Sequence, residues 1–185
     1  MQTYYPSFEA IEQQTQQLDN EQCAHCWQTQ QLVSHGFVRK KRVGGAPEAV
    51  GKRVFCSNRN QRTGCGRTVQ LYLDSKVRYL HYAGCCVVAL LLWLSKGTTV
   101  QRAYHHATGA ATPRNAYRWL HKLWAQLSAY RSLAHQPWLL ATDAPATAHA
   151  HPRWGLLLAT GSALLQLFGD PLCAHFQRQL QRSFL

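Results

Sequence analysis

Acidic residues are scarce in this sequence of 185 residues, which has eight Asp and Glu against twenty Lys and Arg. The resulting net charge of +12 and a pI near 9.7 indicate a polyanionic partner, nucleic acid before a membrane. Charge alone does not say which nucleic acid; the motifs described below are what lead us to expect double-stranded DNA as the partner. The alternative is a basic surface that only contacts solvent.

The shortage of carboxylates also bears on catalysis. After Gly66 the only acidic residues are Asp74, Asp143 and Asp170. A transposase of the paired-metal type needs three well-placed carboxylates, because two metal ions must be held about 4 Å apart. Because none of these three residues lies in a region rich in strands, we expect a protein that binds without catalysis.

Long hydrophobic runs and a signal-like N-terminus are missing as well. The longest apolar run, Cys85 to Leu94, is about half of the ~20 residues that a membrane helix needs. The first residues, Met1 to Pro6, include neither a basic nor an apolar region. We expect a cytoplasmic, nucleoid-associated protein without a membrane partner, whose seven cysteines serve metal binding rather than disulfides.

Four of those cysteines form two pairs, Cys23-Ala-His-Cys26 and Cys56 with Cys65. Thiolates paired on two short loops are the usual ligands of a closed tetrahedral Zn²⁺ site. The second pair is separated by eight residues, more than the usual two to four, but glycines flank Cys65 and suit a tight turn. We predict a structural Zn²⁺ on Cys23, Cys26, Cys56 and Cys65; buried thiols, or ligation by His25 or His35, are the alternatives.

Strand-like segments connect these pairs, as a zinc ribbon requires. We predict strands over residues 32–38, 52–55 and 67–72, with a turn over residues 43–50. The ribbon is basic, with nine Lys and Arg and one acid from Arg39 to Arg67. The DNA contacts that we predict there are Arg39, Lys40, Lys41, Arg42, Lys52 and Arg53.

The order of these motifs carries a resemblance. The Cys-x-x-Cys knuckle, the Ser-His-Gly-Phe strand, the Arg-Val-Phe-Cys return and the Gly-Cys-Gly-Arg-Thr sequence resemble the transposase-type zinc ribbon. That ribbon opens insertion-sequence regulatory proteins and several bacterial transposases. The resemblance implies a following helix-turn-helix and binding to the DNA ends of a mobile element, with a transposase or a second copy as a possible partner. It covers residues 23–127 and departs from the family in the wide Cys56–Cys65 gap.

Helical patterns fill the next region. We predict helices over residues 79–94 and 100–107, and a third helix with Thr112 as its cap and Pro113 at its first position. A short helix, a glycine-containing turn and a longer helix are typical of a helix-turn-helix. Base contacts would come from the start of the third helix, namely Arg114, Asn115, Arg118 and Lys122. A three-helix bundle with a solvated basic face is the alternative.

The fold class predicted for the whole chain is α+β, with a small β zinc ribbon followed by helices. The predicted regions are an acidic, Gln-rich lead-in (1–22), the zinc ribbon (23–76), the helix-turn-helix bundle (77–133), a linker (134–153) and C-terminal helices (154–185). The C-terminal helices have apolar faces that we expect to be buried, either on the helical core or in a dimer; they consist of Leu156, Leu157, Leu164, Leu165 and Phe168 in one helix and Leu172, Phe176, Leu180 and Phe184 in the other. The predicted function is a DNA-binding accessory or regulatory protein of a mobile element; a zinc-ribbon protein-interaction module and a transposase remnant without its catalytic domain are the alternatives.

Overall fold

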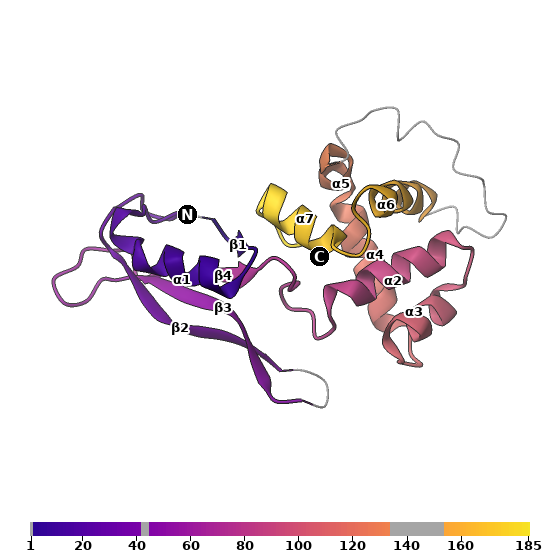
Figure 1. Ribbon diagram of the computed structural model, residues 1–185, viewed down its shortest axis with the longest axis horizontal. Coiled ribbons are helices and arrows are strands. Elements are labelled where there is room, and N and C mark those ends of the chain that lie inside the picture. The colour runs from indigo at the N-terminus through magenta and orange to yellow at the C-terminus, as the bar shows by residue number, and fades with distance from the viewer. Residues whose placement is uncertain (1, 42–44, 134–153) are drawn as a thin grey trace. The chain divides into compact units, whose positions relative to one another are not determined.

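The computed structural model describes residues 2–41, 45–133 and 154–185. Arg42 and the predicted linker, residues 134–153, lie outside the described residues. The chain divides into two compact units, Met1–Lys76 and Val77–Leu185. The first contains the sheet and the second is helical (Figure 1), which confirms the predicted α+β class.

The first unit is built on a four-stranded sheet in the order β1-β4-β3-β2. Strands β2 (Leu32–Lys41), β3 (Pro47–Cys56) and β4 (Thr68–Leu73) pair antiparallel, while β1 (Tyr4–Tyr5) adds to β4 in parallel. Alternation along β3 and β4 sends Val54, Cys56 and Leu71 to one face, where they are buried. That face therefore forms the core of the unit.

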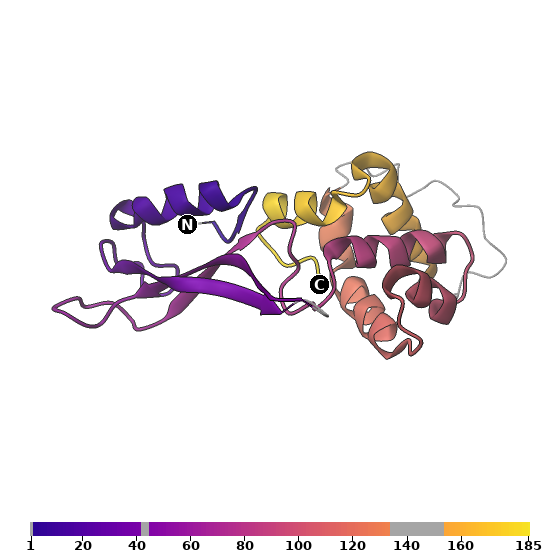
Figure 2. The same ribbon diagram turned by 60° about the horizontal axis from the view of Figure 1, so that its bottom comes forward.

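Helix α1 (Phe8–Gln16) covers this apolar face of the sheet (Figure 2). The side chain of Ser7 caps the helix by accepting a hydrogen bond from the backbone N–H of Ala10, as the sequence predicts. Ile11 and Leu18, which follows in a short 3-10 helix (Leu18–Asn20), are buried against Leu32, Val54 and Leu71. The segment that precedes the first cysteine pair is thus packed on the sheet through Ile11 and Leu18.

The strands extend beyond their predicted limits. Residues 47–50 belong to β3, whereas the sequence predicted a turn over residues 43–50. Pro47 is compatible with a strand because it occupies the first position, where no ladder hydrogen bond is lost from the interior. Strand β1 was not predicted, since two residues carry no readable alternation.

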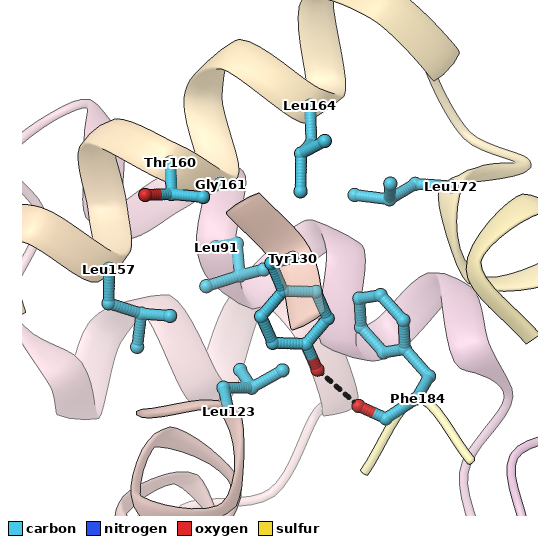
Figure 3. A pocket seen from close by; sticks show the side chains of 9 residues that line it. All are labelled: Leu91, Leu123, Tyr130, Leu157, Thr160, Gly161, Leu164, Leu172 and Phe184. Carbon is cyan, nitrogen blue, oxygen red and sulfur yellow. Dashed lines mark hydrogen bonds between the residues drawn. The ribbon is translucent and has the colours of Figure 1, made fainter. Parts of the chain in front are cut away.

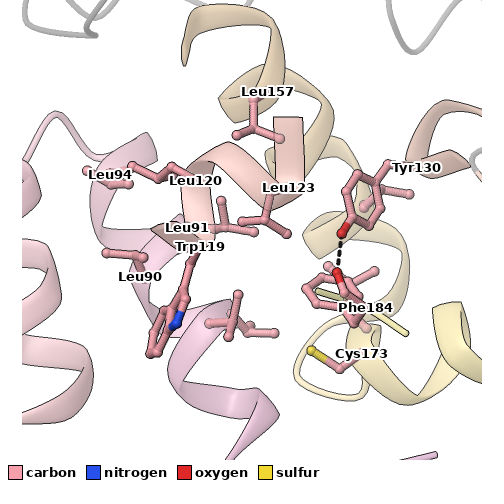
Figure 4. Packing of buried hydrophobic residues seen from close by; sticks show 14 of the residues in the cluster. Leu90, Leu91, Leu94, Trp119, Leu120, Leu123, Tyr130, Leu157, Cys173 and Phe184 are labelled. Carbon is pink, nitrogen blue, oxygen red and sulfur yellow. Dashed lines mark hydrogen bonds between the residues drawn. The ribbon is translucent and has the colours of Figure 1, made fainter. Parts of the chain in front are cut away.

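The helical unit begins with α2 (Gly84–Ser95), α3 (Val100–Thr108) and α4 (Arg114–Ala125), followed by α5 (Leu127–Leu133). Helix α2 is apolar on nearly all sides and lies in the centre of the unit's core. On α4 the side chains of Ala116, Leu120 and Leu123 are buried, and Trp119 lies beside the two leucines (Figure 4). The 3.6-residue period of this helix therefore leaves its polar residues outward.

Helices α6 (Gly155–Phe168) and α7 (Leu172–Leu180) complete the same core. Leu157, Leu164 and Phe176 are buried there. Of the two predicted alternatives, the C-terminal helices therefore pack on the helical core. Beyond α7, the hydroxyl of Tyr130 donates a hydrogen bond to the backbone carbonyl of Phe184 (Figure 3). This bond ties the last residues of the chain to α5.

Three details of the helical prediction are wrong. Helix α2 begins at Gly84, five residues after the predicted start at Tyr79, because Tyr79 has a left-handed φ of 57°. Thr112 does not cap α4; Pro113 is the cap residue and α4 begins at Arg114. Leu156, expected to face inward, is 45% exposed because it lies on the outer side of α6.

Within the described part of the chain, no single helix is long and apolar enough to cross a membrane. Helices α6 and α7 reach the required length only when taken together, and they are bent by 95° at the break between them.

Candidate metal centre and basic helix face

Two tight turns bring the four predicted cysteine ligands together. Cys23 and Cys26 lie in a turn closed by the pairing of Gln22 with Thr29, and the backbone N–H of Trp27 donates to the carbonyl of Cys23. Cys56 ends β3, and Cys65 lies three residues before β4. The first pair thus lies before β2, and the second pair lies in the connection between β3 and β4.

The wide second pair is closed by backbone pairing across its loop. Cys56 donates its N–H to the carbonyl of Arg67, and Gly64 donates to the carbonyl of Ser57. These bonds place Cys56 beside Cys65 and leave residues 58–63 as a loop that projects from the site. The eight residues between Cys56 and Cys65 therefore make the loop longer than in a usual ligand pair, while the two sulfurs stay close together.

The four sulfur atoms lie at the spacing of a tetrahedral metal site. The Sγ atoms of Cys23 and Cys65 are 3.8 Å apart, those of Cys26 and Cys56 are 3.6 Å apart, and all four lie within 4.8 Å of one another. A tetrahedron with metal–sulfur bonds of about 2.3 Å has sulfur–sulfur edges of about 3.8 Å. The four cysteines can therefore hold a metal ion.

Backbone N–H groups point at two of these sulfurs. His25 donates to Sγ of Cys23 at 3.4 Å, and Cys65 donates to Sγ of Cys56 at 3.3 Å. A backbone hydrogen bond from Gln28 lowers the pKa of the Cys26 thiol to about 7, whereas burial raises the pKa of the Cys56 thiol to about 12. A bound cation favours the deprotonated form of every coordinating thiol, so it would overcome the effect of burial.

Gly64 allows this close packing of the loop against a ligand. A Cβ atom at this position would lie 2.4 Å from the carbonyl oxygen of Ser57 and 2.7 Å from Sγ of Cys56. Both distances are shorter than real contacts, so any side chain would displace the loop or the ligand. The glycine that precedes Cys65 in the sequence is therefore required because no side chain fits between the loop and Cys56.

The histidines proposed as alternative ligands take other positions. The ring of His25 is exposed, with Nδ1 3.4 Å from the guanidinium of Arg67, and the ring of His35 packs against Phe55. Among the described residues, the cluster that could hold a metal consists of the four cysteines.

The predicted DNA contacts of the sheet unit divide into two groups. Arg39, Lys41 and Arg53 are exposed and Lys40 is half-buried, whereas Lys52 lies under α1. Its ammonium group is 3.3 Å from Glu12 and 3.4 Å from the hydroxyl of Thr15. Lys52 thus helps to hold α1 on the sheet, whereas the side chains of Arg39, Lys41 and Arg53 extend into solvent.

The predicted contacts of the helical unit all lie on one side of α4. Arg114, Asn115, Arg118 and Lys122 are exposed, and the opposite side of the helix is buried. Before α4, Gly109 ends α3 in a left-handed conformation with φ of 72°, and five residues separate the two helices. The first backbone N–H groups of a helix have no acceptor within the helix. In α4 the cap residue, Pro113, provides no side-chain acceptor for them.

Comparison of the chain with protein-family models, with curated proteins and with solved structures gave no match. The features that bear on function are therefore the four-cysteine cluster and the basic, exposed side of α4.

Proposed function

We propose that the protein binds duplex DNA through α3 and α4, which act as a helix-turn-helix. The observation that carries the proposal is the composition of the exposed side of α4, where Arg114, Asn115, Arg118 and Lys122 project from a helix anchored on its other side by buried residues. Arginine pairs with guanine and asparagine with adenine by two hydrogen bonds each. A helix of this kind can both contact phosphates and read bases.

The charge of the surrounding surface supports the proposal. In residues 77–133 and 154–185 the only carboxylate side chain is Asp170, in the turn between α6 and α7, against nine Lys and Arg. No acidic side chain on α3 or α4 opposes an approaching phosphate. The uncapped first turn of α4 adds N–H donors and the positive end of the helix dipole.

In this proposal the sheet unit is a zinc ribbon with a structural ion. Four thiolates at tetrahedral spacing favour Zn²⁺, and a site filled by four protein ligands has no position for a substrate or water. Exposed Arg39, Lys41 and Arg53 would add phosphate contacts. The proposed role is binding without catalysis, at the ends or promoter of a mobile element, as the resemblance of residues 23–127 implies.

The first test is the salt dependence of binding to a fluorescent duplex. Neutralising about four phosphates predicts a slope of about −3.6 in log affinity against log salt, a loss of roughly a hundred-fold between about 50 and 200 mM. Lys122→Ala should reduce the slope by about 0.9 if Lys122 contacts one phosphate. An affinity that does not change with salt would contradict the proposal.

The second test separates base reading from phosphate contact. DNA selected from a random pool is compared with an unrelated duplex, using Arg114→Ala and the wild-type protein. A base contact predicts that Arg114→Ala weakens binding to the selected sequence by about 1–3 kcal/mol and leaves the unrelated duplex nearly unchanged. Equal losses on both duplexes would assign Arg114 to the phosphate backbone.

A second candidate, a protein-interaction module, is favoured by one observation. Trp27, in the turn of the first cysteine pair, is 70% exposed although it is a large aromatic residue. Exposed tryptophans are frequent binding hot spots in protein interfaces. Purified protein that ignores duplex DNA, but binds a partner protein in a manner abolished by Trp27→Ala, would favour this candidate.

A further inference from the structure

The helical unit contains a groove beside the exposed side of α4. Its volume is about 620 Å³, within the range of about 300–1,000 Å³ that is typical of small-ligand sites. One wall is the segment Arg78–Tyr82, which precedes α2, and the other is α4. The α4 residues that line it are Asn115, Arg118, Trp119, His121 and Lys122.

The groove is built for an anion. Arg78, Arg118 and Lys122 supply positive charge, and His81 and His121 add ring nitrogens. No Asp or Glu side chain is among its lining residues. Leu185, the last residue of the chain, also lines the groove, so its main-chain carboxylate is the one acidic group there. Three cationic side chains outnumber it, and phosphate oxygens are acceptors that such donors bind strongly.

Aromatic rings line the same groove and favour a ligand larger than a phosphate. Tyr79 is 84% exposed, and the guanidinium of Arg78 lies 5.5 Å from the centre of its ring. Tyr82 and Trp119 meet edge to face with their ring centres 5.5 Å apart, which fixes the inner wall. Tyr79 also has a left-handed φ of 57°, which turns the chain here and sets its ring out into solvent.

We propose that this groove binds an unpaired nucleotide next to the duplex that α4 contacts, with the base stacked on Tyr79 and the phosphate held by Arg78, Arg118 or Lys122. The inference rests on the proposed function, because the duplex on α4 delivers the nucleotide to the groove. Duplex phosphates alone could use the basic side chains, but a stacked base pair offers no free face to Tyr79. The exposed ring therefore favours an unpaired base.

The experiment measures three affinities by fluorescence anisotropy: for a blunt duplex, for the same duplex with a short unpaired oligothymidine tail, and for the oligothymidine alone. The wild-type protein should bind the tailed duplex about ten-fold more tightly than the blunt one, as expected for stacking of one base on an aromatic ring. Tyr79→Ala should remove this advantage and leave the blunt-duplex affinity unchanged. Tyr79→Phe retains the ring and should retain the advantage.

Each other outcome has a defined meaning. Equal wild-type affinities for tailed and blunt duplex, or an equal loss on both in Tyr79→Ala, would overturn the inference and leave the proposed duplex binding intact. Tail-dependent binding without any affinity for the blunt duplex would refute the proposed function and, with it, the placement of the nucleotide next to a duplex; the groove would then bind single strands alone. Because Tyr79 is 84% exposed, its replacement removes no core packing, and an unchanged circular dichroism spectrum checks the fold.

Discussion

At the scale of single residues, Gly64 gives the sharpest test of the metal centre. Gly64→Ala would place a methyl group against Ser57 and Sγ of Cys56, so we expect weaker metal binding, measured by competition with a chromogenic chelator. Thr63→Ala is the matched control, because Thr63 is exposed and its loop contact is made by the backbone N–H. Equal metal affinities of the two variants would show that the loop yields without moving the ligand.

Tyr130 makes a second test possible in the helical unit. Tyr130→Phe removes the donor to the carbonyl of Phe184 and leaves that buried acceptor unsatisfied, which should lower the free energy of unfolding by about 1–3 kcal/mol in urea titrations. Tyr117→Phe, on the exposed side of α4, should change it by less than about 0.5 kcal/mol. A neutral Tyr130→Phe would mean that the C-terminal residues are not fixed by this bond.

At the scale of elements, α4 must be held rigidly if its outer side reads DNA. Leu120 is fully buried, and Leu120→Ala should destabilise the helical unit by about 2–5 kcal/mol in the same titration. Leu156→Ala in α6 deletes an equal side chain that is 45% exposed and should cost far less. Similar losses in the two variants would contradict the observed packing of α4.

The sequence predicted the elements that local patterns define. The inward residues of α4 follow a helical period, and the spacing of Cys23 and Cys26 indicates a metal ligand pair without knowledge of the fold. Features that depend on tertiary contacts were missed. Lys52 looked like one more surface cation until α1 placed Glu12 next to it.

The groove was missed for a similar reason. Residues 79–83 contain neither glycine nor proline, so the sequence contains no break signal between Tyr79 and the start of α2 at Gly84. The left-handed conformation of Tyr79 turns the chain before α2, and this turn sets Arg78 and Tyr79 opposite α4. Only the folded chain brings these distant residues to one site.

At the scale of the whole molecule, the two units have separate cores and only one contains the cysteine cluster. Removal of the proposed Zn²⁺ by a chelator should therefore unfold the sheet unit and leave the helical unit folded, since metal binding and folding are coupled in small metal domains. In nitrogen-correlated NMR spectra the indole signal of Trp27 should move, while those of Trp119 and Trp154 should not. Loss of all these signals on chelation would show that the helical unit depends on the metal.

The sequence separation of the ligands has a consequence for the newborn protein. Cys23 and Cys65 are 42 residues apart, so the first pair leaves the ribosome well before its partners exist. At about 5–20 residues per second, that delay is about two to eight seconds, during which Cys23 and Cys26 are unprotected thiols. If the four cysteines bind Zn²⁺ as proposed, oxidants and free zinc would then compete for the same sulfurs. The share of new protein that acquires a folded sheet unit would in that case depend on the zinc available during translation.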